Sequence, residues 1–271
     1  MENQALREKA LQLRKDVARM IGAGKPGHLG GSCSLADIVT YLYYEEMKLD
    51  PTNPQLPDRD RFLLSKGHAA LIQYAALGDL GFYPREEEKT LKVLGSRLQG
   101  HPDLRKLPGI EANTGSLGQG ISMAAGMAAG LRIDKLPARV YCCLGDGELA
   151  EGQVWEAFMS AGVYRLSNLC AVLDLNGLQA TGPVAERFDS SPYKEKLEAF
   201  RWHVIEIDGH DFDQIREAFR AAKEVKDKPT AILAHTVKGK GFAFAENVVG
   251  FHNGSMTQEQ LDAALATQEV V

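Results

Sequence analysis

The stretch from Leu144 to Gln179 constrains the fold more than any other part of the sequence. Its first residue, Leu144, ends the apolar run 139–144. Gly145-Asp146-Gly147 follows, and its flanking glycines let the backbone turn sharply and approach a ligand. Apolar residues at helical spacing follow, and then a second apolar run from Leu169 to Leu175 that leads directly into Asn176. The stretch therefore predicts a strand, a crossover helix and a second, parallel strand beside the first.

This unit predicts that Asp146 and Asn176 meet at the carboxyl edge of the sheet, because neighbouring parallel strands end there together. A carboxylate and an amide oxygen are ligands that a hard cation such as Mg²⁺ prefers, with phosphate oxygens completing its shell. The alternative is an ordinary strand-to-helix turn followed by a turn asparagine. The crossover spacing and the position of Asn176 after the second strand favour a cation site.

The remaining sequence predicts further alternation of helices and strands. We expect a first helix over 4–21, a helix capped by Ser34 that extends to Met47, and a final helix with a Thr257–Gln260 capping box. Other expected strands span 61–65, 203–207 and 230–234, and other expected helices span 69–80, 85–93, 121–131, 193–200 and 211–223. Because strands alternate with helices at crossover lengths, we predict one α/β domain over 1–271, with a mostly parallel sheet covered by helices on both faces.

The composition limits which classes of binding partner we expect and indicates a cellular location. The net charge of −5 gives no electrostatic reason to expect nucleic acid or an anionic membrane surface, so a phosphorylated ligand must be met by local positive groups. No apolar run approaches the ~20 residues that span a bilayer. The four cysteines lack zinc-ligand spacing, and three lie in expected buried strands, which favours reduced thiols and a cytoplasmic location.

Histidines recur in glycine-containing loops. His28, His68, His101 and His252 all fall in such predicted loops. Histidine can donate to a phosphate or sugar hydroxyl and can exchange protons near neutral pH, so several on one sheet edge would form a polyol-handling site. The alternative, that they are scattered loop residues, stays open on this pattern alone.

The order and spacing of the motifs resemble the amino-terminal, diphosphate-binding half of transketolase over nearly the whole chain. The matching stretches are 27–32 (GHLGGS), 65–69 (SKGHA), 100–102 (GHP), 114–120 (TGSLGQG), 145–148 (GDGE) with 151–152 (EG), 174–176 (DLN), 208–211 (DGHD) and 238–241 (KGKG). The resemblance implies a thiamine diphosphate- and Mg²⁺-dependent transferase, with Ca²⁺ or Mn²⁺ as possible substitutes, that moves a two-carbon ketol unit from a ketose phosphate to an aldose.

The resemblance also assigns expected roles to single residues. Asp146, Asn176 and the Leu178 carbonyl would hold the metal against the diphosphate, and His28, His68, His101 and His252 would surround the reacting atoms of cofactor and substrate. Glu151 is similar to a family glutamate that communicates between cofactor sites across the dimer. The residues expected at the cofactor are His68, Gly115, Ser116, Leu117, Gly145, Asp146, Gly147, Glu148, Glu151, Asn176, Leu178, Lys238 and His252.

The chain lacks the later part of the transketolase pattern. That part supplies a pyrimidine-binding domain, the glutamate that protonates the aminopyrimidine, and the arginines that bind the sugar phosphate. We therefore expect that a separately encoded carboxyl-terminal subunit completes the site, in an assembly of two plus two chains. Lys25-Pro26 and Ala180-Thr181 depart from the family pattern in ways that bear on substrate preference. The alternatives are a thiamine diphosphate enzyme for a branched or sulfonated ketose, and a non-catalytic cofactor-binding scaffold.

Overall fold

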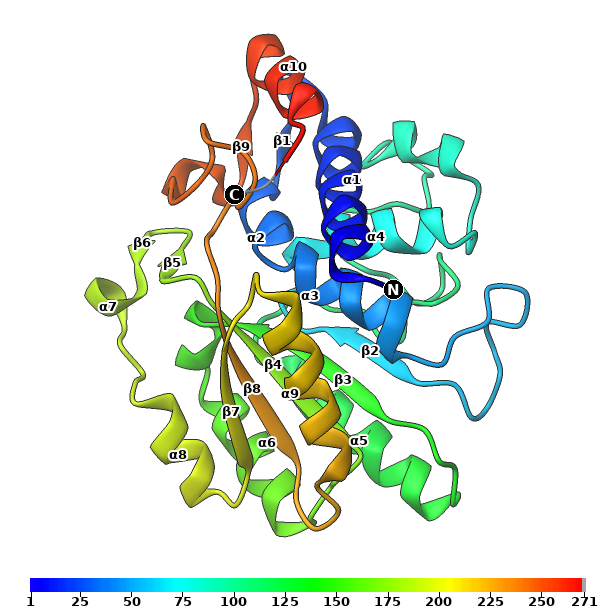
Figure 1. Ribbon diagram of the computed structural model, residues 1–271, viewed down its shortest axis with the longest axis vertical. Coiled ribbons are helices and arrows are strands. Elements are labelled where there is room, and N and C mark those ends of the chain that lie inside the picture. The colour runs from blue at the N-terminus through cyan, green and yellow to red at the C-terminus, as the bar shows by residue number, and fades with distance from the viewer. Residues whose placement is uncertain (270–271) are drawn as a thin grey trace.

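A parallel five-stranded sheet forms the centre of the computed structural model, which describes residues 1–269 (Figure 1). Its strands lie in the order β2-β3-β4-β8-β7. They span β2 (Arg61–Leu64), β3 (Val140–Gly145), β4 (Leu169–Leu175), β7 (His203–Asp208) and β8 (Thr230–His235). The register places Gly145 opposite Asp174, so Asp146 and Asn176 follow neighbouring strand ends, as predicted.

Helices cover both faces of the sheet, which confirms the predicted architecture. One face packs against α1 (Asn3–Ile21), α3 (Ala36–Tyr41), α4 (Ala70–Asp79) and α9 (Phe212–Glu224), and the other against α5 (Gln119–Ile133), α6 (Gly152–Val163) and α8 (Tyr193–Ala199). Figure 1 shows α9 in front of the sheet and α5 and α6 behind it. Because side chains alternate along a strand, Tyr141 and Cys143 enter the first core while Cys142 and Leu144 enter the second.

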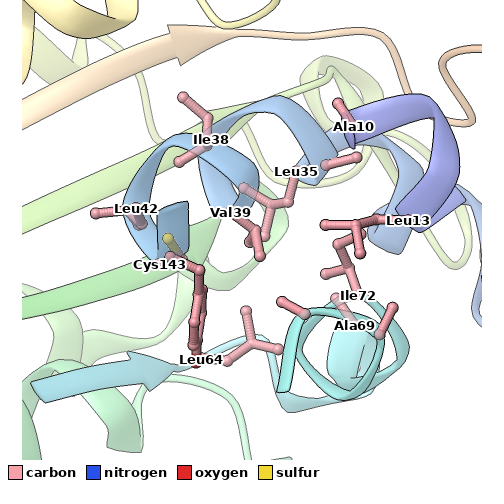
Figure 2. Packing of buried hydrophobic residues seen from close by; sticks show 14 of the residues in the cluster. Ala10, Leu13, Leu35, Ile38, Val39, Leu42, Leu64, Ala69, Ile72 and Cys143 are labelled. Atoms are coloured by element: carbon pink, nitrogen blue, oxygen red, sulfur yellow. The ribbon is translucent and has the colours of Figure 1, made fainter. Parts of the chain in front are cut away.

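The first core joins the amino-terminal helices to the sheet. Figure 2 shows Leu13, Leu35, Val39 and Ile72 pointing toward one another above Leu64 of β2. These buried side chains fix α1, α3 and α4 against the strand edge, and hydrophobic burial of this kind contributes roughly 1.5–3 kcal/mol for each large side chain. The segment that joins α1 to α3 is thereby held at the carboxyl edge of the sheet, where Ser34 meets Asp174.

Short elements complete the described part of the fold. They are α2 (Leu29–Ser34), α7 (Val184–Arg187), α10 (Gln258–Ala266), the π-helix η1 (Leu42–Glu46), the 3₁₀ helices η2 (Gly67–Ala69), η3 (Arg85–Thr90), η4 (Gly147–Ala150) and η5 (Val249–His252), and two small ladders, β1 (Pro26–Gly27) with β9 (Gly254–Ser255) and β5 (Leu178–Gln179) with β6 (Gly182–Pro183). The β1–β9 ladder places Gly27 opposite Gly254, and so brings the chain ahead of His28 beside the chain that follows His252. None of the helices within 1–269 has the length and apolar character needed to cross a bilayer.

Local details differ from the predictions in three places. Ser34 does not cap a helix, because its hydroxyl donates to the Asp174 carboxylate at 2.6 Å, and the expected helix is instead divided into α2, α3 and η1. The expected helix over 85–93 is the shorter 3₁₀ helix η3, and His68 and His252 lie in η2 and η5 and not in open loops. The Thr257–Gln260 capping box is present as predicted.

A matched pair of helical glycines tests the packing of α6. A Cβ atom at Gly162 would lie 1.8 Å from the Phe200 carbonyl oxygen, whereas a Cβ at Gly130 of α5 would meet nothing within 4 Å. We predict that Gly162→Ala lowers the free energy of unfolding by about 3 kcal/mol, because backbone atoms must move apart. Gly130→Ala should raise it by about 0.5–1 kcal/mol, because alanine favours the helix. Urea denaturation measures both, and equal effects of the two substitutions would contradict the packing described for α6.

Candidate functional site

A cavity of about 220 Å³ opens where β3 and β4 end. Its walls come from segments far apart in the sequence: the turn after β2, the turn after β3, the β4–β5 connection and the two segments that carry Lys238 and His252. The predicted site residues that line it are His68, Leu117, Gly145, Asp146, Gly147, Glu148, Asn176, Leu178, Lys238 and His252. The cavity therefore lies at the sheet edge that the strand pattern predicts.

Asp146 and Asn176 shape the wall formed by the β3 and β4 ends. The Asp146 carboxylate accepts hydrogen bonds from the Gly147 amide at 2.8 Å and from the Gly177 amide at 2.5 Å, which ties the two strand ends together. The Asn176 side-chain oxygen accepts from the Leu178 amide at 3.1 Å. Burial and the neighbouring Asp174 raise the pKa of Asp146 to about 6, so this carboxylate lacks full compensation from nearby positive charge.

A buried ammonium group marks the Leu178 carbonyl as a cation-binding position. Lys238 is 2% exposed, and its Nζ donates to the Leu178 carbonyl oxygen at 2.7 Å. Burial and the nearby Lys66 lower the pKa of Lys238 to about 8. A carboxylate, an amide oxygen and a carbonyl that already faces a cation form a donor set that fits a hard metal ion. Residues 1–269 contain no group of three or more His, Cys, Asp or Glu that could hold a metal ion.

The four predicted histidines converge beside this cavity. The His28 ring centroid lies 5.2 Å from that of His68, 5.5 Å from that of His252 and 6.2 Å from that of His101. The His68 and His252 centroids are 4.9 Å apart. The alternative of scattered loop residues is therefore wrong, although only His68 and His252 line the cavity itself.

The surroundings of the four histidines favour the neutral form of each imidazole. Burial and the Lys66 ammonium lower the pKa of His68 to about 2, and burial and Lys238 lower the pKa of His252 to about 4. Burial, His252 and Lys92 lower the pKa of His28 to about 4, and burial and Lys92 also lower the pKa of His101. Neutral imidazoles can accept a proton and can donate a hydrogen bond, so the cluster is suited to proton exchange with hydroxyl groups.

A buried ion pair that the sequence did not predict as part of the site lies at the cavity, with Lys66 in its lining. The Lys66 ammonium contacts the Asp174 carboxylate and donates to the Gly31 carbonyl at 3.1 Å. Although burial alone would raise it, Lys66 and hydrogen bonds from neighbouring side chains keep the pKa of Asp174 below its usual value. A usable signal existed, because Asp174 is a carboxylate inside an apolar strand and Lys66 directly follows the β2 region.

Glu148 has a supporting position. Its carboxylate accepts from the Ser65 hydroxyl, from the Gly118 amide at 2.7 Å and from the Gly145 amide at 3.1 Å. It thereby joins the turn after β2, the turn after β3 and the segment before α5. Burial raises its pKa. These contacts engage both carboxylate oxygens. Glu148 therefore contributes to the site by holding the cavity wall in place and not by contacting a ligand.

Other predicted residues lie outside the cavity. Gly115, Ser116 and Glu151 do not line it, and Glu151 is exposed at the start of α6. Gly115 has a φ of +140°, and a Cβ there would lie 2.7 Å from the His101 ring, so this position accommodates the histidine cluster. The lining also includes Gly31, Lys66 and Gln179, which the sequence did not single out as site residues, and Ala180 and Thr181, which it named only for their bearing on substrate preference.

Comparison with known proteins identifies the family. Residues 7–268 match the family model described as transketolase, thiamine diphosphate binding domain. The chain is 45% identical over 264 residues to the 6-deoxy-6-sulfo-D-fructose transketolase subunit SqwG of Clostridium sp. strain MSTE9, covering 97% of this chain and 96% of that one. It is 37% identical to an apulose-4-phosphate transketolase subunit of Phocaeicola vulgatus, covering 98% of this chain and 94% of that one.

The fold agrees with a solved structure. The transketolase of Campylobacter jejuni superposes with a TM-score of 0.92 at 34% identity, covering 97% of this chain but 42% of that one. The chain thus spans most of the length of the two subunits and well under half of that transketolase. On the family match, the identities and the shared fold, the chain belongs to the transketolase family and forms its thiamine diphosphate-binding domain.

Proposed function

We propose that the chain is the diphosphate- and metal-binding subunit of a two-subunit transketolase that moves a two-carbon ketol unit from a ketose phosphate to an aldose. The observation that carries this proposal is the convergence of four histidines from separate segments beside a cavity whose wall holds Asp146, Asn176 and Lys238. Proton-exchanging groups beside a diphosphate- and metal-compatible wall are what such a transfer requires of this half of the site.

The wall at the ends of β3 and β4 would hold the cofactor diphosphate and its metal. Asp146, Asn176 and the Leu178 carbonyl supply oxygen ligands suited to Mg²⁺, Ca²⁺ or Mn²⁺. The Lys238 ammonium, 2.7 Å from the Leu178 carbonyl, would turn to a phosphate oxygen when a metal takes the carbonyl. Bound thiamine diphosphate supplies a carbon nucleophile that no side chain offers.

The histidines would handle substrate protons. His28, His68, His101 and His252 would donate hydrogen bonds to the substrate carbonyl and hydroxyls, and His252 would accept the proton of the hydroxyl next to the bond that breaks. Their lowered pKa values keep them neutral at pH 7, so each can act as an acceptor.

The exposed face of α6 supports self-association. Met159, Val163 and Tyr164 are 47%, 58% and 70% exposed, and a groove of about 320 Å³ runs between α5 and α6. Apolar side chains in a row on one face are typical of an interface. Glu151 begins the same helix, as its expected role between two cofactor sites requires. We propose that two copies meet here and that each binds one copy of a carboxyl-terminal subunit, which is supported by the two full-length relatives being named as subunits.

The substrate is the open part of the proposal. The two relatives that the chain matches over nearly their whole length are named for 6-deoxy-6-sulfo-D-fructose and apulose-4-phosphate, which supports a modified ketose as the second candidate. Ala180 and Thr181 line the cavity and are departures from the family pattern that bear on this choice. The scaffold alternative is less well supported, because a binding remnant needs no cluster of neutral histidines.

The four cysteines are free and buried, which supports our proposal of a cytoplasmic location for this single domain over 1–271.

The first prediction from this proposal concerns cofactor binding. Titration of thiamine diphosphate with Mg²⁺ into the chain, with and without its candidate partner, followed by exchange of the cofactor C2 proton, should give fast exchange only in the mixture. Asp146→Asn should weaken binding at least about tenfold, because a metal-facing charge is lost, whereas the exposed Asp134→Asn serves as the matched control. Absence of binding in both samples would remove the catalytic proposal, and turnover by the chain alone would remove the need for a partner.

The second prediction concerns the protonation state of His68. Because its pKa is about 2 in the folded chain and about 6.5 when unfolded, stability present above pH 6.5 is lost as the pH falls toward the folded value. Replacing His68 with Asn should therefore reduce the slope of unfolding free energy against pH, between pH 6 and 4, by up to about 1.4 kcal/mol per pH unit. Asp146 acts with the opposite sign below its raised pKa, but equally in both proteins.

Urea denaturation across this pH range measures that slope. The matched control is His235→Asn, which replaces an exposed histidine outside the cavity lining. An unchanged slope for His68→Asn would show that His68 is already charged in the folded protein.

A further inference from the structure

The DGHD motif at 208–211 has no place in the cavity. Asp208 ends β7, and Asp211 caps α9 by accepting from the Asp213 and Gln214 amides. His210, between them, is largely buried, with a side chain 13% exposed. Its imidazole therefore needs an explanation other than contact with the cavity.

One nitrogen of His210 meets a buried carboxylate. Its Nδ1 lies 2.7 Å from Asp37 Oδ2, and Arg14 donates to the same carboxylate through Nη1 at 2.9 Å and Nη2 at 2.5 Å. Burial would raise the pKa of Asp37, but Arg14 and His210 lower it to about 2. Arg14 also donates to the Cys33 carbonyl at 3.1 Å. The Asp37 carboxylate is therefore charged and links α1, α3 and the turn before α9.

The other nitrogen of His210 meets the backbone of the segment that carries Lys238. The Val237 amide donates to His210 Nε2 at 2.9 Å. A backbone N–H can only donate, so Nε2 must be unprotonated and the ring proton must lie on Nδ1, facing Asp37. The hydrogen-bond pattern thus fixes both the tautomer and the orientation of the ring.

These contacts immobilise the backbone on both sides of Lys238. Val237 donates to His210, and Gly239 donates to the Gly30 carbonyl at 3.0 Å. With both neighbours fixed, the Lys238 side chain is directed across the cavity toward the Leu178 carbonyl. A chain of contacts therefore runs from Arg14 through Asp37, His210 and Val237 to the ammonium group in the cavity wall.

We propose that His210 is a positioning residue for Lys238, acting through the Val237 amide and kept in its Nδ1–H tautomer by Asp37. This inference rests on the proposed cofactor-binding role of Lys238. It assigns the DGHD motif, at the end of β7, to the support of the site and not to contact with a ligand. The principle is that of a metal-site histidine whose far nitrogen is oriented by a carboxylate, applied here to a backbone amide.

Two substitutions at 210 separate the two hydrogen bonds. A glutamine oxygen can take the place of Nε2 and accept from Val237, whereas an asparagine side chain ends near Nδ1 and reaches only Asp37. We predict that His210→Asn weakens binding of thiamine diphosphate with Mg²⁺ about five- to tenfold and that His210→Gln stays within about twofold of the unmodified protein. The binding assay is the same titration in the presence of the partner subunit.

Amide hydrogen exchange, followed by NMR, gives a readout independent of the cofactor. The Val237 amide should be protected in the unmodified chain and in His210→Gln, and should exchange faster in His210→Asn, while the Gly239 amide stays protected in all three. His235→Asn and His235→Gln are matched controls, because His235 is exposed and lies two residues before Val237. These controls should leave both Val237 protection and cofactor affinity unchanged.

The outcomes distinguish the two proposals. If the unmodified protein binds no cofactor, the proposed function fails while Val237 exchange still tests the contact. If the unmodified protein binds cofactor but Asn and Gln at 210 behave alike in affinity and exchange, His210 has no positioning role. Should neither variant fold, the imidazole nitrogens of the unmodified chain decide by NMR, since protonation of His210 at Nε2 would contradict the proposal.

Discussion

The cavity depends on one buried carboxylate, that of Asp174. It contacts the Lys66 ammonium after β2 and the Thr236 hydroxyl after β8, and it accepts from Ser34 of α2 and from the Asn176 side chain at 3.1 Å. One fully buried side chain thereby joins the ends of three strands to an amino-terminal helix. Removing a single member of such a pair leaves an uncompensated buried charge, which costs about 3–5 kcal/mol. The contacts of Asp174 therefore hold the strand ends that carry the cavity wall in place without any ligand.

The cavity holds buried positive charges, although the chain as a whole is negatively charged. The chain carries a net charge of −5, yet Lys66 and Lys238 are both buried at the cavity. Together with burial, which has the larger effect, they lower the pKa of the neighbouring His68 and His252. Under the proposed function, the ammonium groups that would attract a phosphate group would therefore also keep the histidines neutral.

The sequence predicted the strand-level geometry well because that geometry is local. The Asp146–Asn176 relation follows from one crossover unit, and the parallel sheet follows from repeated units of the same kind. What could not be predicted depends on contacts across the chain. Ser34 looks like a helix cap in its own sequence neighbourhood, but Asp174, 140 residues away, takes its hydroxyl. The pattern alone left the convergence of the histidines open, because no periodicity links residues 28, 101 and 252. The family resemblance implied that they converge.

The two-residue ladder between β1 and β9 bears on when the site can form during synthesis. Pro26 pairs with Ser255 and Gly27 with Gly254, so the segments next to His28 and His252 meet only after residue 255 has been synthesised. The sheet order places β8 between β4 and β7, so the core also waits for late residues. During synthesis the turn after β3 is available early, whereas the segments that carry His28 and His252 can be joined only late. The histidine cluster therefore depends on long-range pairing, and its assembly is separated in time from that of the turn beside it.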